Sequence, residues 1–263
     1  MPVLTAKDLG KSFDHVVAAK DINLTVEAGE TIGIIGANGA GKTTFVNMIT
    51  GYLKPTTGRI LLGERDITGL GPREITALGV CRSFQVAQVF PTMSVEDNMA
   101  IALGLARRGK GALWRPLHTN ALLADADAML DRFRINDYRD ALGSELPQGV
   151  RKLLDIAMAV ASEPQILLLD EPTSGISVEE KYEIMDVVMG ALHGERRTIL
   201  FVEHDMEIVE RYAGRVLAFY DGTVIADGPP ADALADPKVR EFIIGEVLHR
   251  SRRSEEPAES AGA

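Results

Sequence analysis

The sequence predicts an α/β fold in which a helical subdomain interrupts a strand-rich core. Apolar and β-branched runs at residues 31–35, 165–169 and 198–202 are typical of buried strands, and a loop and a helical pattern follow the first two. Between these runs, residues 94–162 show mostly helical periodicity. Because strand–loop–helix units flank this stretch, we expect residues 1–93 and 163–245 to form one core lobe and residues 94–162 a helical subdomain.

Composition narrows the class of protein. The chain has 263 residues and a formal net charge of −10, from 28 basic and 38 acidic residues. Since an acidic chain repels nucleic-acid phosphates, we expect no nucleic-acid partner. The single cysteine, Cys81, excludes an internal disulfide and is expected to be a small buried side chain. With no signal-peptide pattern and no apolar run of about 20 residues, we expect a soluble cytosolic protein, ending in a disordered tail at residues 246–263.

Turn residues and periodicity place the individual elements. A helix is expected over residues 43–53, ended by Pro55. Its apolar face would contain Phe45, Val46, Ile49, Tyr52 and Leu53. The other elements are expected as short strands within 3–35, a strand at 59–62, a helix at 72–78, a strand at 80–84, a helix at 178–192 capped by Ser177 and Glu180, and a hairpin at 216–226.

The loop after the third predicted strand carries the first chemical motif. Residues 36–43 read Gly-Ala-Asn-Gly-Ala-Gly-Lys-Thr and fit the pattern G-x-x-x-x-G-K-[ST] between a strand and a helix. Glycines let backbone N–H groups point at phosphate oxygens, and the following helix adds its positive dipole end. Lys42 can reach the β- and γ-phosphates, and the Thr43 hydroxyl can bind Mg²⁺. The motif predicts a nucleotide site made by Asn38, Gly39, Ala40, Gly41, Lys42, Thr43 and Thr44.

Two acids end the apolar strand predicted at residues 165–169. Asp170 is the candidate magnesium ligand, and Glu171 is the candidate base that orients or deprotonates an attacking water. The carboxyl end of a parallel strand is where ligands bind. Acids at strand ends also often just begin a loop, so it is the phosphate loop upstream that favours the functional interpretation.

Together these motifs resemble the ATP-binding subunits of ABC transporters. The chain is most similar to the larger of the two ATPase subunits of branched-chain amino acid importers, over nearly its whole length to about Gly245. Residues 228–230 and 236–245 are similar to the C-terminal extension of those subunits, although lipopolysaccharide-export ATPases share most of the rest. The resemblance implies a P-loop NTPase domain of the ABC type, with an antiparallel β subdomain and a helical subdomain, and ATP and Mg²⁺ as cofactors.

The resemblance implies roles for three further residues. Phe13 matches the aromatic ring that stacks on adenine, and the less favoured alternative is an ordinary core residue of its strand. Gln85 matches the glutamine that contacts the magnesium or the attacking water and links the site to the helical subdomain. His204 matches the histidine that contacts the γ-phosphate. The implied catalytic set is Glu171, His204 and Gln85, and the implied metal ligands are Thr43, Gln85 and Asp170.

One stretch departs from the family pattern. Where the family signature reads L-S-G-G-Q, this chain has Leu146, Pro147, Gln148, Gly149 and Val150. Pro147 removes the serine hydroxyl that would reach the γ-phosphate across a dimer, while Gly149 and the following helix N-terminus still offer backbone N–H groups. The departure suggests a heterodimer with two unequal ATP sites. Ser177, where an aspartate is common, could weaken communication between the sites, or could simply cap its helix.

The resemblance thus predicts an ATPase subunit that powers an importer of branched-chain amino acids or related amides and organic acids. Its expected partners are integral membrane permease subunits, a second ATPase subunit and a periplasmic solute-binding protein. Its expected location is cytoplasmic and peripheral, on the inner face of the cell membrane. The alternatives are an ATPase of a lipid or lipopolysaccharide export system, a nucleotide-binding subunit with a regulatory role, and a soluble ATPase acting on DNA or ribosomes.

Overall fold

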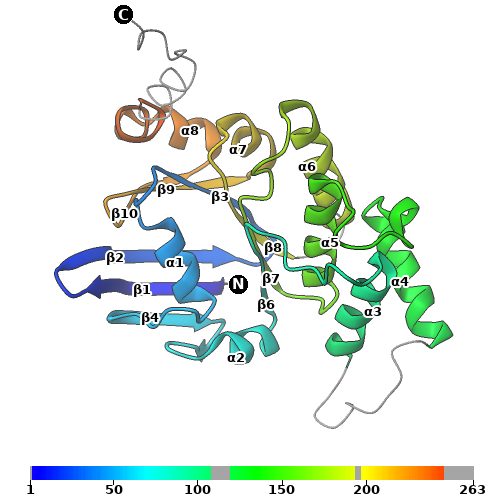
Figure 1. The fold of residues 1–263 in the computed structure, drawn as a ribbon. Coiled ribbons are helices and arrows are strands. Elements are labelled where there is room, and N and C mark those ends of the chain that lie inside the picture. Colours follow the sequence, from blue (N-terminus) through cyan, green and yellow to red (C-terminus); the bar gives the residue numbers. More distant parts are fainter. Residues whose placement is uncertain (1, 108–118, 193–196, 246–263) are drawn as a thin grey trace, which may run out of the picture.

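The computed structural model describes residues 2–107, 119–192 and 197–245. These residues form two β-sheets and a layer of helices (Figure 1). The expected tail at residues 246–263 lies outside the described residues. In the described part of the chain, no helix is both long enough and apolar enough to cross a membrane.

A mostly parallel sheet forms the centre of the molecule. Within the described residues its strand order is β10-β9-β3-β8-β7-β6, and only the β9–β10 hairpin pairs antiparallel. The carboxyl ends of β3, β6, β7 and β8 therefore meet at one edge. The bounds are Thr31–Gly36 (β3), Val80–Ser83 (β6), Ile166–Asp170 (β7), Thr198–Val202 (β8), Arg215–Tyr220 (β9) and Thr223–Gly228 (β10).

A second, antiparallel sheet has the strand order β2-β1-β4-β5. Its alternating sequence buries one face: Ile22, Leu24 and Val26 are at most 6% exposed, and their polar neighbours face solvent. The bounds are Pro2–Phe13 (β1), Val16–Glu27 (β2), Thr57–Leu62 (β4) and Arg65–Asp66 (β5).

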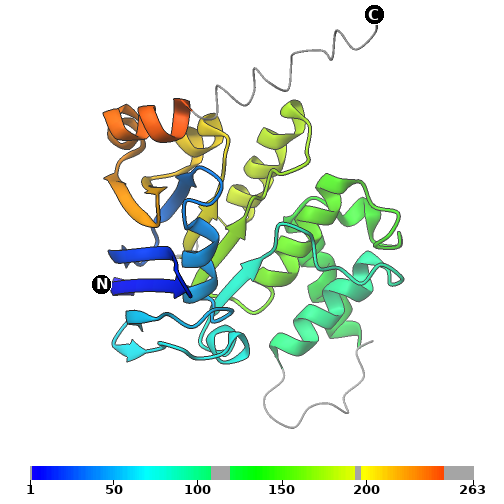
Figure 2. The ribbon, with the colours of Figure 1, turned by 60° about the vertical axis from the view of Figure 1, so that its left-hand side comes forward.

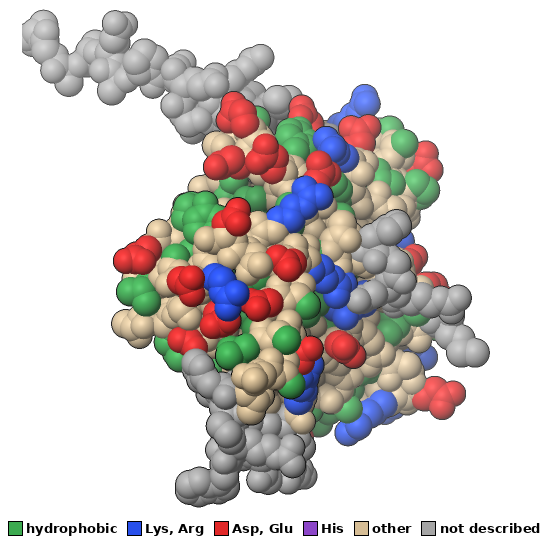
Figure 3. Space-filling view, turned by 90° about the vertical axis from the view of Figure 1, so that its right-hand side faces the viewer, with side chains coloured by type: hydrophobic (Ala, Val, Ile, Leu, Met, Phe, Trp, Pro, Cys, Tyr) green, Lys and Arg blue, Asp and Glu red, His purple; other side chains and the backbone are tan. Residues whose placement is uncertain are grey.

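Most helices lie on the other side of the central sheet from the antiparallel sheet (Figure 2). α5 contacts α3, α4, α6 and the strands β6 and β7, so it connects the helical side to the sheet. On the outer face of α3, α4 and α5, acidic, basic and hydrophobic side chains are interspersed (Figure 3). The bounds are Lys42–Ile49 (α1), Pro72–Ala77 (α2), Val95–Ala106 (α3), Asn120–Arg132 (α4), Asn136–Tyr138 (η1), Gln148–Val160 (α5), Val178–Leu192 (α6), Met206–Tyr212 (α7), Pro230–Ala235 (α8), Pro237–Val239 (α9) and Arg240–Ile244 (η2).

The central sheet separates two hydrophobic cores. Along β7, Leu167 and Leu169 pack into the core under the helices, whereas Ile166 and Leu168 pack into the core shared with α1 and the antiparallel sheet. This alternation follows from the period of two in a strand. Because both faces are covered, β7 is an uninterrupted apolar run that ends only at Asp170.

The structure corrects the end of one expected helix and adds a helix that was not expected. The helix after the phosphate loop ends at Ile49 instead of residue 53, because Gly51 takes a φ of 78° that an α-helix does not allow. Tyr52 consequently leaves the apolar face and is 55% exposed. Helix α7, which the sequence analysis missed, begins at the N-cap Asp205, whose side chain accepts a hydrogen bond from Glu207 N.

Candidate functional site

The glycine-rich loop joins β3 to α1 and approaches the antiparallel sheet closely. Gly41, the N-cap of α1, has a φ of 101°, and a Cβ at this position would lie 2.8 Å from the carbonyl oxygen of Ala18. Only glycine satisfies both conditions. The loop therefore turns directly into the helix, with the N-terminal amides of α1 beside it.

Lys42 is held inside this loop. Its side chain is buried, and Nζ donates hydrogen bonds to the carbonyl oxygens of Gly36 (2.5 Å) and Ala37 (3.0 Å). Burial lowers the pKa of the Lys42 ammonium, and the nearby carboxylates of Glu171 and Asp170 act in the opposite direction. The loop thus keeps a buried cation next to two acids from the end of β7.

A pocket of about 290 Å³ opens over this loop. Its lining contains the predicted loop residues together with Glu171 and His204. The side chain of Thr43 is exposed and that of Thr44 partly so. These loop residues are Asn38, Gly39, Ala40, Gly41, Lys42, Thr43 and Thr44.

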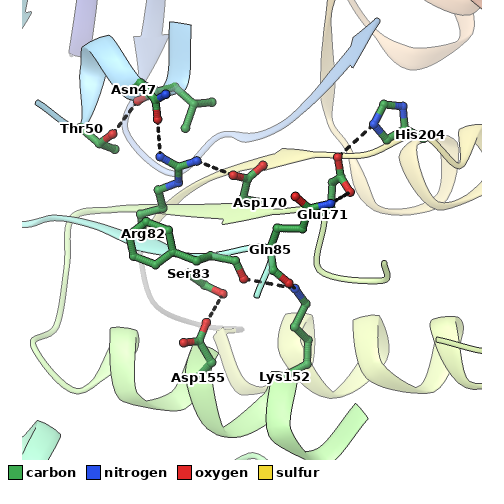
Figure 4. Close-up of polar contacts among 12 residues, drawn as sticks. Asn47, Thr50, Arg82, Ser83, Gln85, Lys152, Asp155, Asp170, Glu171 and His204 are labelled. Carbon is green, nitrogen blue, oxygen red and sulfur yellow. Dashed lines mark hydrogen bonds and ion pairs between the residues drawn. The ribbon is translucent and has the colours of Figure 1, made fainter. Parts of the chain in front are cut away.

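Glu171 stands at the centre of a three-residue contact (Figure 4). Its Oε2 accepts a hydrogen bond from Gln85 Nε2 at 2.7 Å, and its Oε1 lies 3.1 Å from His204 Nε2. A left-handed φ of 48° turns Glu171 off the line of β7, and its backbone N donates to Val202 O at 3.0 Å. The structure therefore brings together Gln85, Glu171 and His204 from the segments that follow β6, β7 and β8.

Glu203, which the sequence analysis missed, holds the backbone beside Glu171 and His204. The buried carboxylate accepts hydrogen bonds from Thr173 N (3.0 Å), Thr173 Oγ1 (2.7 Å) and His204 N (3.1 Å). Burial raises the pKa of Glu203, and these hydrogen bonds oppose the rise. The available signal was an acid directly after the apolar run of β8, where a buried charge needs partners.

Asp170 is paired with Arg82, a second residue that the sequence analysis missed. Arg82 Nη2 donates to Asp170 Oδ2, and Nη1 donates to Asn47 Oδ1 at 2.7 Å. The guanidinium also lies 5.0 Å from the ring centroid of Phe84. The Asp170 carboxylate is thus held at the sheet edge by a neighbour from β6 (Figure 4).

The donor set agrees with magnesium held jointly by the protein and a phosphate. No group of three or more His, Cys, Asp or Glu side chains suited to a metal exists among the residues that the structure describes. The Thr43 hydroxyl, the Asp170 carboxylate and the Gln85 amide supply only oxygen ligands, and too few for a protein-only cage. Mg²⁺ characteristically takes one or two carboxylates and completes its octahedron with water and substrate phosphates. The residues therefore fit this ion.

The site residues lie in a segment of the chain that matches a known protein family. A family model described as ABC transporter matches residues 19–174, which include the glycine-rich loop, Gln85, Asp170 and Glu171. The chain belongs to the ABC transporter family. ATP-binding cassettes of this family are ATPases, so the predicted enzyme class is confirmed.

Individual relatives extend the likeness to nearly the whole chain. LivG of Salmonella typhimurium, named a high-affinity branched-chain amino acid transport ATP-binding protein, is 33% identical over 252 residues, covering 94% of this chain and 99% of LivG. The probable LivG of Archaeoglobus fulgidus is 31% identical and covers 93% of this chain and 96% of its own.

Solved structures confirm the fold. An ATP-binding cassette of an ABC transporter in its ADP conformation matches with a TM-score of 0.82 and 30% identity, covering 93% of this chain and 99% of that chain. A nucleotide-free cassette matches with a TM-score of 0.79 and 27% identity. The predicted ABC-type P-loop domain, with an antiparallel β subdomain and a helical subdomain, is therefore confirmed.

The segment that matches the ABC signature lies at the start of α5, outside the 290 Å³ pocket. Leu146 is buried, Val150 is partly buried, and Pro147 is the N-cap of α5 and makes no side-chain cap. Gln148 Nε2 donates to Ser174 O at 3.3 Å. A Cβ on Gly149 would lie 2.8 Å from Ile184 Cδ1, so this glycine lets α5 approach α6 closely.

Phe13 and Ser177, the two other positions compared with the ABC family, do not line the pocket. Phe13 ends β1, where its ring is 47% exposed and lies 5.0 Å from Lys11 Nζ. Its exposure excludes the core interpretation. Ser177 caps α6, since its Oγ accepts a hydrogen bond from Glu180 N at 3.3 Å.

Proposed function

We propose that this ABC ATPase hydrolyses ATP at the loop–Glu171 site to power an importer of branched-chain amino acids or related amides and organic acids. The observation that carries the proposal is the contact of Glu171 with Gln85 and His204 beside the glycine-rich loop. The amino-acid class is supported by relatives named as branched-chain amino acid transport ATP-binding proteins, which match this chain nearly end to end.

The proposed chemistry assigns a role to each group around the pocket. Lys42 and the amides of residues 38–44 bind the β- and γ-phosphates, and the exposed ring of Phe13 stacks on adenine. Glu171 accepts a proton from the attacking water, and His204 contacts the γ-phosphate and holds one Glu171 oxygen. Thr43, Asp170 and Gln85 would hold Mg²⁺, which offsets the negative charge of the phosphate oxygens.

The proposed assembly follows from the similarity of this chain to the ATP-binding subunits of branched-chain amino acid transporters. The partners are membrane permease subunits, a second ATPase subunit and a periplasmic solute-binding protein, with this chain on the cytoplasmic face of the membrane. Named relatives are described as ATP-binding proteins of transport systems, which supports permease partners. Pro147 supports a heterodimer, because this chain lacks the signature hydroxyl for a partner's γ-phosphate.

The test is ATP turnover by the assembled transporter with Glu171→Gln. The substitution keeps the size of the side chain and one acceptor oxygen but removes the base, so turnover should fall by about 10²- to 10⁴-fold. Glu179→Gln, at an exposed position on α6, serves as the matched control and should leave turnover unchanged. Equal turnover by Glu171→Gln and the wild type would show that Glu171 is not the base.

The alternative that the sequence leaves open is a regulatory subunit that binds nucleotide without hydrolysing it. A single-turnover assay with ATP, using the chain assembled with its partners, separates the two. Release of phosphate from ATP bound at this chain's own loop supports the ATPase. Retention of intact ATP over many turnovers of the partner supports the regulatory subunit. Uptake of leucine into proteoliposomes, as opposed to extrusion of a lipid, then decides between importer and exporter.

A further inference from the structure

Helix α5 carries two buried charged side chains that the proposed reaction does not use. Lys152 and Asp155 are 3% and 6% exposed, and they lie three residues apart on one side of the helix. Charged groups are rarely buried unless hydrogen bonds satisfy them, because desolvation is costly. The identity of their hydrogen-bond partners therefore indicates what these residues do.

Both side chains bind the segment that contains Gln85 (Figure 4). Lys152 Nζ donates to the backbone carbonyls of Phe84 (3.1 Å) and Gln85. Asp155 Oδ2 accepts from Ser83 Oγ at 2.6 Å, and its Oδ1 accepts from Gln88 N at 2.7 Å. These four contacts extend along residues 83–88, with Gln85 in the middle.

The rest of this segment is also attached to the helices. Asn98 on α3 is fully buried, accepts a hydrogen bond from Phe90 N at 2.7 Å and donates to Phe90 O at 3.1 Å. Gly143 N donates to Met93 O at 2.9 Å. From the end of β6 onward the chain is thus held by the helical side, while the Gln85 amide reaches back 2.7 Å to Glu171 on the sheet side.

We propose that Lys152 and Asp155 are positioning residues that hold the main chain around Gln85, so that the Gln85 amide meets Glu171. The proposal rests on the function proposed above, in which Glu171 is the base.

The test is a double-mutant cycle between Lys152 and Gln85, measured as ATP turnover of the assembled transporter. Lys152→Met keeps the chain length but removes the donor. We expect kcat to fall by about tenfold or more, since a reacting group displaced by about 1 Å can cost 10²-fold, with the KM for ATP little changed. In a Gln85→Ala background, Lys152→Met should cause no further loss. Lys152→Arg should recover most of the activity, and Lys238→Met, at an exposed site on α9, is the control.

Three outcomes would overturn the proposal. They are wild-type kcat in a folded Lys152→Met variant, an equal loss of kcat with and without Gln85, or a loss confined to KM. If Lys152→Met does not fold, Asp155→Asn takes its place in the same cycle, because the amide keeps one acceptor oxygen. If Glu171 is not the base, the Glu171→Gln variant would turn over ATP as fast as the wild type, whatever the Lys152 variants do. This result distinguishes failure of the proposed function from failure of the positioning role.

Discussion

Arg82 offers the sharpest test of how the sheet edge is held. The side chains of Arg82 and Asp170 are 8% and 16% exposed, and Arg82 also donates to Asn47. Arg82→Met keeps most of the volume but removes the ion-pair partner of the almost buried Asp170 carboxylate, leaving it the longer-range attraction of Lys42 and Lys152. Breaking a buried pair from one side costs about 3–5 kcal/mol. We take the lower limit, about 3 kcal/mol, because Asp170 keeps some solvent contact and because the wild-type Arg82 Nε has no hydrogen-bond partner.

The assay is thermal unfolding without nucleotide. At about 2–4 °C per kcal/mol for a chain of this size, Tm should fall by about 6–12 °C. Arg211→Met removes a pair with Asp186 in which both side chains are 52% exposed, and this control should cost about 1 kcal/mol or less. In a cycle with Asp170→Asn, the double variant should lose less than the sum of the single losses. Additive losses, or a shift no larger than in the Arg211 control, would refute the buried pair.

Three further outcomes follow from the structure. Gly36→Ala would place a Cβ 2.5 Å from Phe219 O, and the resulting loop displacement of about 1 Å should lower ATP turnover about 100-fold. Burial raises the pKa of Cys81, so the stability that its protonated thiol provides is complete below the unfolded pKa of about 8.5 and is lost as pH rises through the folded pKa. Urea unfolding from pH 7 to 10 should therefore show a steeper fall for the wild type than for Cys81→Ala. Phe133 is fully buried, so Phe133→Ala should cost about 3–5 kcal/mol in the same assay, and a loss under about 1 kcal/mol would contradict the packing.

The sequence predicts best what depends on local pattern. The phosphate loop is a continuous motif between a strand and a helix, and all its predicted residues line one pocket. The ends of parallel strands must meet at one sheet edge, so Glu171 and His204 could be expected near that loop. The 3.1 Å contact between Glu171 and His204 could not be predicted, because it also depends on the left-handed backbone conformation of Glu171.

The residues that the sequence analysis missed act through distant partners. Arg82 pairs with a residue 88 positions away, and Lys152 bonds a carbonyl 68 positions away. In a single sequence, either residue could equally be a solvated charge. Only the strand order, which sets β6 beside β7, gives Arg82 a buried acid to neutralise.

The residues of the altered signature, 146–150, fall into two groups: those that match the family pattern and those that differ from it. Leu146, one of the two family-like residues, has a packing reason to be present, since it is 5% exposed, whereas a Cβ at Gly149 would meet only the terminal methyl of Ile184. Retention of Leu146 is therefore no argument for a contact with a partner's phosphate. Of those that differ, Pro147 and Gln148 are exposed. Neither side chain has a hydroxyl, and Gln148 Nε2 donates to Ser174 O. A γ-phosphate that meets this surface finds backbone amides but no signature hydroxyl, whereas the pocket over this chain's own loop has Lys42, Glu171 and His204. This contrast within one chain is what supports a heterodimer whose two ATP sites differ in rate.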